Sequence, residues 1–173
     1  MKVIFLDRDG VINQEVGYLH KSKNFKFIDG IFEACKYFQS LGFKVIVVTN
    51  QSGIARGYYQ EKDFHILTEW MLAQFYEQCI DILDVFFCPH GPNSTCKCRK
   101  PKPGMLIEAR DKHGINMSES WMIGDRQRDI TAASLAGITN TILVGSGHKT
   151  YEENSQIKYH LNTLNDIRNV IKF

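Results

Sequence analysis

Lys2-Val3-Ile4-Phe5-Leu6-Asp7-Arg8-Asp9-Gly10 is the stretch that decides the fold. Its four consecutive apolar residues predict a short strand that is buried on both faces of a parallel sheet. The strand ends at Asp7 and Asp9, and Gly10 permits a tight turn. Ligands of open α/β sheets bind beyond the carboxyl ends of the strands. Two acids at such an end repel each other, which suggests a bound cation or a pair with one protonated member. The alternative is that both acids only cap a turn.

Strands and helices alternate along the rest of the chain, with little periodicity over residues 11–29. Apolar runs predict strands over 44–48, 82–87, 120–123 and 140–144, and helical periodicity predicts helices over 31–41, 61–79, 105–113, 129–136 and 167–173. Such alternation implies a parallel sheet with right-handed crossovers. We expect one three-layer, Rossmann-like α/β/α domain over residues 1–173. Cys35 and Cys79 fall on apolar helical faces, which places both in the predicted core.

Composition excludes several classes of protein. The 173 residues are 43% hydrophobic and 23% charged, and their formal net charge is +2. These values are typical of a soluble globular domain and give no reason to expect nucleic acid or membrane as a partner. No apolar run reaches the roughly 18 residues of a membrane span, and the sequence lacks a secretory segment, so we expect a cytoplasmic protein. The sequence shows no exposed interface stripe, which predicts a monomer.

Polar residues of complementary kinds follow three of the predicted strands. Asp7 and Asp9 follow the first, Thr49 ends the second, and Asp125 follows a later one. Lys100 lies in the loop before the helix at 105–113. Carboxylates that suit Mg²⁺, together with hydroxyl and ammonium donors, form a site for a phosphoryl group. Each residue alone also has an ordinary interpretation, as a strand end, a solvated lysine or a helix cap.

A second candidate metal site lies between residues 88 and 98. Cys88, His90, Cys96 and Cys98 form the pattern Cys-x-His-x₅-Cys-x-Cys. Three thiolates and one imidazole suit a tetrahedral structural Zn²⁺ in a reducing compartment. The alternative is a loop with free thiols. Because Cys98 directly precedes Arg99 and Lys100, we expect the zinc to fix the backbone that presents these two cations.

The motifs together resemble those of the haloacid dehalogenase (HAD) superfamily. The matching residues are Asp7-Arg8-Asp9-Gly10, Thr49, Lys100-Pro101 and Gly124-Asp125 with Asp129. The likeness is closer to one branch, the heptose bisphosphate phosphatases, through residues 7–13, 27–30, 49–57 and 98–101. Histidinol-phosphate phosphatases are the near relative. The short spacing of the cysteine loop is familiar from that second branch, so histidinol phosphate stays an alternative substrate.

The resemblance implies a role for each motif residue. Asp7 would be the nucleophile that forms an aspartyl-phosphate, and Asp9 would act as general acid and then as general base. Mg²⁺ would be held by the Asp7 carboxylate, the Asp9 backbone carbonyl and Asp125. Thr49 and Lys100 would hold the transferring phosphoryl oxygens. The residues expected to contact substrate are Asn50, Gln51, Ser52, Arg56, Arg99 and Lys100.

The implied activity is removal of the C7 phosphate from a heptose 1,7-bisphosphate in the synthesis of lipopolysaccharide or a related surface polysaccharide. Too few residues precede the second strand for a large cap domain, so the loops at 17–27, 52–59 and 88–100 would select the substrate. Arg56, Lys21 and Lys23 are candidates to bind the distant phosphate. A catalytically inactive phosphosugar-binding protein and a receiver-type phospho-acceptor domain are alternatives. Neither explains both the Asp7–Asp9 pair and the cysteine loop.

Overall fold

The computed structural model describes residues 1–145 and 156–172. Six parallel strands form its sheet in the order β3-β2-β1-β4-β5-β6. The strands are β1 (Val3–Leu6), β2 (Lys44–Asn50), β3 (Ile82–Cys88), β4 (Trp121–Gly124), β5 (Asn140–Val144) and β6 (Tyr159–Leu161). This arrangement confirms the predicted parallel α/β sheet, with β1 near its middle.

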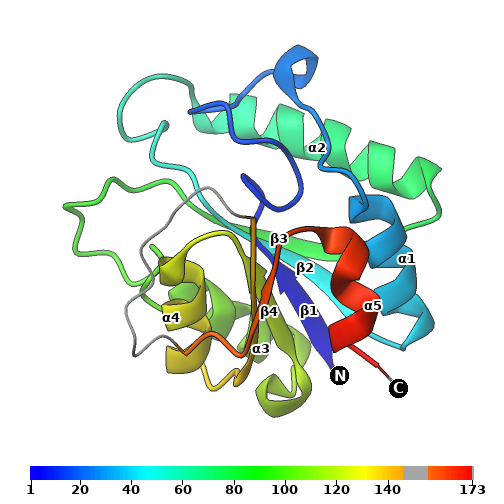
Figure 1. Cartoon of the computed structure of the whole chain (residues 1–173). Coiled ribbons are helices and arrows are strands. Elements are labelled where there is room, and N and C mark those ends of the chain that lie inside the picture. The colour runs from blue at the N-terminus through cyan, green and yellow to red at the C-terminus, as the bar shows by residue number, and fades with distance from the viewer. Residues whose placement is uncertain (146–155, 173) are drawn as a thin grey trace.

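Five helices cover the two faces of the sheet (Figure 1). They are α1 (Ile31–Ser40), α2 (Glu61–Glu77), α3 (Gly104–His113), α4 (Gln127–Leu135) and α5 (Ile167–Val170). Side chains of a strand alternate between the faces, so Ile4 and Leu6 pack with α1, α2 and α5, whereas Val3 and Phe5 pack with α3 and α4. All four β1 side chains are fully buried. This explains why the first strand is a continuous apolar run.

Several predicted boundaries differ from the observed ones. Helix α4 begins at Gln127, two residues before the predicted start, because the Asp129 carboxylate accepts a hydrogen bond from the Arg126 N–H and caps the first turn. Helix α5 ends at Val170 instead of 173, and residue 173 lies outside the described residues. Strand β6 was not predicted. Its three residues are too few to show a periodicity, and it exists through pairing with β5.

The prediction that Cys79 lies in the core is wrong. Helix α2 ends at Glu77, so Cys79 no longer follows the buried face of that helix. It is exposed, with a φ of 60°, in the turn that leads to β3. Cys35, by contrast, is fully buried in α1 as predicted.

The segment between β1 and α1 forms a loop over the carboxyl end of the sheet. Its described regular structure consists of one 3₁₀ turn, Ser22–Asn24, and two isolated bridges, which pair Asn13 with Asp9 and with Phe27. Leu19 and Phe25 anchor the loop in the core. The predicted lack of a large cap domain is therefore confirmed for this part of the chain. None of the described helices is both long enough and apolar enough to cross a bilayer.

Replacing Cys79 with glycine is expected to stabilise the protein. A residue with a β-carbon is strained at a φ of 60°, and glycine relieves this strain at the cost of a more flexible unfolded chain. The expected gain in the free energy of unfolding, measured by urea denaturation, is about 0.5 kcal/mol. Cys79→Ala is the matched control, since it removes the thiol but keeps the β-carbon. An equal gain in both variants would contradict the backbone explanation.

Candidate active site

The site lies at the carboxyl end of the sheet, where β1, β2 and β4 end side by side. The Asp7 N–H donates to the Ile123 carbonyl at 3.0 Å, which fixes the first acid against β4. Gly10 has a φ of 89°, and a β-carbon there would lie 2.2 Å from Asp125 Oδ2. Glycine is therefore needed both for the turn and for the close approach of Asp125.

A buried lysine lies at the centre of the site. Lys100 Nζ lies 3.0 Å from Asp7 Oδ1 and 2.7 Å from Asp129 Oδ1, and the Lys100 side chain is 1% exposed. Nζ also donates to the Val48 carbonyl at 2.7 Å. Burial by itself would lower the pKa of Lys100, but Asp129 and Asp7 outweigh it and the pKa is raised. Lys100 is thus held as an ammonium ion in contact with the predicted nucleophile.

Asp7, Asp125 and Asp129 each offer an oxygen within 4.8 Å of the others. Burial raises the pKa of Asp7 to about 6, with a further contribution from Asp129. Burial also raises the pKa of Asp125 to about 8, and the Asp7 and Asp129 charges add to the shift. Asp125 Oδ1 is buried and has no hydrogen-bond partner among the described residues. Crowded carboxylates and an unpartnered buried oxygen fit a hard divalent cation such as Mg²⁺.

Asp9 lies beside this cluster and is partly exposed to the pocket. Three side chains donate hydrogen bonds to its carboxylate. Arg8 Nη2 contacts both oxygens at 3.0 and 3.1 Å, Asn13 Nδ2 contacts Oδ1 at 3.0 Å, and Gln51 Nε2 contacts Oδ2 at 3.1 Å. The second acid is therefore held in one orientation at the edge of the open space.

Thr49 and Asn50, the polar residues at the end of β2, make different contacts in the site. Thr49 is fully buried, and its hydroxyl accepts a hydrogen bond from Gln51 Nε2 at 2.8 Å. The Asn50 side-chain amide bonds both backbone groups of Lys100, as donor to the carbonyl and as acceptor from the N–H, each at 3.0 Å. Asn50 thus positions the lysine and also lines the pocket, and its predicted contact with substrate stays a prediction.

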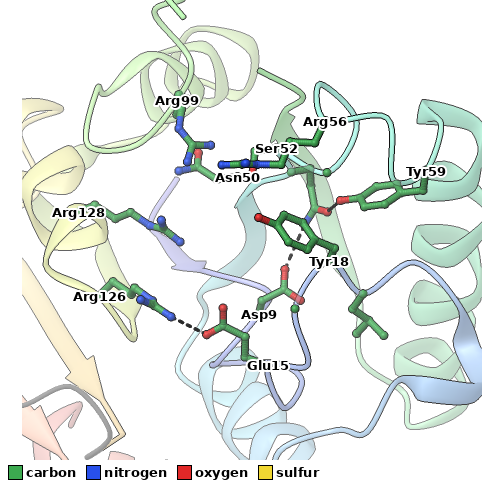
Figure 2. A pocket seen from close by; sticks show the side chains of 14 residues that line it. Asp9, Glu15, Tyr18, Asn50, Ser52, Arg56, Tyr59, Arg99, Arg126 and Arg128 are labelled. Carbon is green, nitrogen blue, oxygen red and sulfur yellow. Dashed lines mark hydrogen bonds and ion pairs between the residues drawn. The ribbon is translucent and has the colours of Figure 1, made fainter. Parts of the chain in front are cut away.

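A pocket of about 340 Å³ opens above these residues (Figure 2). Four arginines point toward it, Arg56 and Arg99 from two loops and Arg126 and Arg128 from the start of α4. Arg126 is paired with Glu15 at 2.7 Å across the mouth. Burial and the neighbouring Arg128 guanidinium lower the pKa of Arg99. Among the described residues the lining includes two carboxylates, Asp9 and Glu15, against four arginines, so the pocket is suited to an anionic ligand.

Aromatic contacts join the loop after β1 to the loop after β2. The rings of Tyr18 and Tyr58 meet edge to face at 4.6 Å, and His20 stacks on Tyr59 at 5.1 Å. Arg56 lies over the Tyr18 ring, with its guanidinium carbon 5.8 Å from the ring centre. Ser52 lines the same wall. Arg56 is one of three candidates for the distant phosphate. The other two, Lys21 and Lys23, line a separate depression beside α2 and lie outside the active-site pocket.

The cysteine loop follows β3 and brings its four predicted ligands together. Their ligand atoms lie within 4.8 Å of one another. Cys88 Sγ is 3.8 Å from Cys96 Sγ and 3.5 Å from His90 Nδ1. Zn–S bonds of about 2.3 Å in a tetrahedron place sulfur atoms about 3.7 Å apart. The Cys88–Cys96 distance matches this value, whereas Cys88 Sγ and Cys98 Sγ lie only 2.9 Å apart, so it is the type and grouping of the four donors that fit Zn²⁺. Arg99 Nη1 donates to the His90 carbonyl at 3.2 Å, which connects this loop to the pocket.

Sequence reasoning assigned no individual role to several residues of the site. Those that the structure adds are Arg8, Asn13, Glu15, Tyr18, Tyr59, Arg126, Arg128 and Asp129. Asp129 was already recognised as a motif residue with Asp125, but its contact with Lys100 was not expected. The other contacts cross between loops, and no local pattern indicates them.

Comparison with known proteins gives close matches. A family model described as HAD-hydrolase-like matches residues 97–168. D-glycero-alpha-D-manno-heptose-1,7-bisphosphate 7-phosphatase of Photorhabdus laumondii is 44% identical over 176 residues, which cover 96% of each chain. D-glycero-beta-D-manno-heptose-1,7-bisphosphate 7-phosphatase of Yersinia pestis is 44% identical over 98% of this chain and 94% of the relative.

A solved structure is similar over the whole fold. D,D-heptose 1,7-bisphosphate phosphatase from B. bronchiseptica, complexed with magnesium and phosphate, has a TM-score of 0.84 to this chain. The two are 30% identical over 96% of each chain. This likeness confirms the predicted HAD-type fold.

Mg²⁺ affinity is expected to depend on pH through Asp125. Its carboxyl group, with a pKa of about 8, must lose its proton before it can bind the ion. Below about pH 8 the apparent affinity, measured by calorimetric titration, should therefore fall by roughly tenfold per pH unit.

Asp125→Asn is the matched variant for this measurement, since it keeps the shape of the side chain but cannot ionise. It should bind Mg²⁺ more weakly than the wild type at high pH and should lose most of the pH dependence. An affinity of the wild type that stays constant between about pH 6 and about pH 8 would contradict the assignment of Asp125 as a ligand.

Proposed function

The chain belongs to the family of D-glycero-D-manno-heptose-1,7-bisphosphate 7-phosphatases, and from this premise we propose that it hydrolyses the C7 phosphate of a heptose 1,7-bisphosphate. We propose that the product serves the synthesis of nucleotide-activated heptose for lipopolysaccharide or another surface polysaccharide. The observation that carries the mechanism is the buried contact of Lys100 with Asp7 next to the arginine-lined pocket.

Asp7 is proposed to attack the phosphorus atom. As the Asp7 oxygen–phosphorus bond forms, the bond between phosphorus and the sugar oxygen breaks, and the Asp9 carboxylic acid gives its proton to that oxygen. Lys100 and the Thr49 hydroxyl are proposed to hold the other phosphoryl oxygens. Lys100 already carries a charge and lies 3.0 Å from Asp7, so it needs little reorganisation during the transfer.

Water then releases the phosphate from the enzyme. Asp9, now a carboxylate, accepts a proton from water, and the water oxygen forms a bond to phosphorus as the Asp7–phosphorus bond breaks. Asp9 is thereby returned to its acid form for the next turnover. Its position at the edge of the pocket, with hydrogen bonds from Arg8 and Gln51, suits a group that exchanges protons with the open side of the site.

We propose that Mg²⁺ is held by the carboxylates of Asp7 and Asp125 and by the Asp9 backbone carbonyl. When bound, it supplies positive charge that keeps Asp7 ionised beside an anionic phosphate. Asp129 is proposed to hold the Lys100 ammonium ion in place, through the contact of 2.7 Å between Asp129 Oδ1 and Lys100 Nζ.

The charge of the pocket favours a bisphosphate over histidinol phosphate. A heptose 1,7-bisphosphate carries a second phosphate, for which Arg56 and Arg99 are the proposed partners. Histidinol phosphate has an ammonium group instead, which the arginines of the pocket would repel. The short cysteine loop still makes histidinol phosphate the second candidate. Asn50, Gln51, Ser52 and Tyr18 would complete the substrate contacts.

We propose that the cysteine loop holds a structural Zn²⁺ through Cys88, His90, Cys96 and Cys98. The ion would cross-link the loop through these four ligands and would keep Arg99 and Lys100 in place. Three cysteines used as metal ligands also support a reducing compartment, and we propose the cytoplasm. The monomeric state and the single-domain organisation stay predictions from the sequence.

Phosphate release tests the assignment most directly. With Mg²⁺ present, heptose 1,7-bisphosphate should be hydrolysed with a kcat/KM at least about 100-fold above that of histidinol phosphate, since histidinol phosphate offers Arg56 and Arg99 no second phosphate and brings an ammonium group that they would repel. Asp9→Asn should lower kcat by roughly 100-fold or more with little change in KM. Preference for histidinol phosphate would reassign the substrate, and normal turnover by Asp9→Asn would overturn the acid–base role.

Removal of zinc is expected to lower activity more than it lowers global stability. The ion would lie beside Arg99 and Lys100, whereas three of its four ligands, His90, Cys96 and Cys98, lie outside the strands and helices. After chelation the melting temperature should fall by only a few degrees, while kcat/KM should drop by about tenfold or more. His90→Ala should give the same pattern without a chelator. Unchanged kinetics in a sample shown to be free of zinc would refute this role.

A further inference from the structure

Arg8 is a buried charged residue that the proposed chemical steps do not use. It lies between the two catalytic acids in sequence, and its side chain is 2% exposed. Its guanidinium carbon lies 5.9 Å from the centre of the Phe64 ring, beneath the pocket. Nε and Nη1 have no hydrogen-bond partner among the described residues. A guanidinium group buried with two nitrogens unpaired is costly, which calls for a functional reason.

All the hydrogen bonds of the Arg8 side chain come from one nitrogen. Nη2 donates to both Asp9 oxygens at 3.0 and 3.1 Å, to the Leu19 carbonyl at 3.1 Å and to Gln51 Oε1 at 3.4 Å. Leu19 belongs to the loop after β1, and Gln51 begins the loop after β2. One cation therefore contacts the general acid and both loops that form the wall of the pocket.

The second loop is tied to the same point through an additional residue. The Tyr59 hydroxyl donates to Gln51 Oε1, and the Tyr59 ring stacks on His20. Gln51 in turn donates to Asp9 at 3.1 Å. A shift of either loop would thus move a hydrogen-bond partner of Arg8 or of Asp9.

We propose that Arg8 is a positioning residue that holds the Asp9 carboxyl group toward the leaving oxygen and couples its orientation to the two substrate loops. This inference rests on the proposed function, because it takes Asp9 as the proton donor. Displacing a catalytic group by about 1 Å can lower the rate about 100-fold. A contact that fixes Asp9 therefore has a large effect on the rate of proton transfer.

The test compares two leaving groups through kcat/KM, which covers steps up to the loss of the alcohol. A sugar oxygen needs a proton as it leaves, whereas p-nitrophenolate leaves without one. Arg8→Met should lower kcat/KM for heptose 1,7-bisphosphate by about 100-fold, and for p-nitrophenyl phosphate by no more than about threefold. Arg8→Lys, which keeps one donor nitrogen with a charge, should recover about tenfold of the loss.

Two further variants separate the possible outcomes. Asp9→Asn should show the same dependence on the leaving group. The control is Arg110→Gln, which replaces an exposed arginine on α3 and should leave kcat/KM unchanged for both substrates. If Arg8→Met lowered kcat/KM equally for both substrates, Arg8 would be a structural residue and the inference would be overturned. If Asp9→Asn also lacked the selectivity, the proposed proton donor itself would be wrong. Normal activity toward the aryl phosphate shows that a variant is folded, and Arg8→Lys provides the test if Arg8→Met does not fold.

Discussion

The buried ammonium ion of Lys100 is the constraint on which the rest of the site depends. It lies between Asp7 and Asp129, and Asp125 adds a third carboxylate to the same small volume. One lysine cannot neutralise three carboxylates, and the raised pKa values of Asp7 and Asp125 follow from this shortage of positive charge. The proposed divalent cation would complete the balance. The affinity that we propose for a metal ion would therefore follow from how these acids are buried.

The arrangement separates the chemistry from the recognition of substrate. The proposed reacting acids Asp7 and Asp9 follow β1 in the middle of the sheet, where strand pairing on both sides fixes the end of the strand. The pocket wall is built from loops that contact each other through aromatic pairs such as Tyr18–Tyr58. Without a cap domain, these loops and the cysteine loop provide the enclosure. Arg8 and Asn50 are the points at which the loops contact the catalytic residues.

The sequence was sufficient to predict the parallel sheet, because buried strands such as β1 are continuous apolar runs with polar residues at their ends. It also identified the four donors of the cysteine loop by type and spacing, whereas Asp7 and Asp125 were assigned to Mg²⁺ through the resemblance to the HAD superfamily. It did not indicate β6 or the exposure of Cys79, which depend on strand pairing and on where α2 ends. Nor did it show that Asn50 binds the backbone of Lys100. That contact joins residues 50 positions apart, which come together only in the folded chain.

The place of β1 in the sheet has a consequence for how the chain is made. The first strand to leave the ribosome has two neighbours, and one of them, β4, is more than a hundred residues further along the chain. The apolar surface of β1 stays incompletely covered until Trp121–Gly124 has been synthesised, and Asp129 reaches Lys100 only after that. Such long-range pairing folds slowly and leaves the nascent chain open to aggregation. The site is therefore incomplete until about three quarters of the chain has been synthesised.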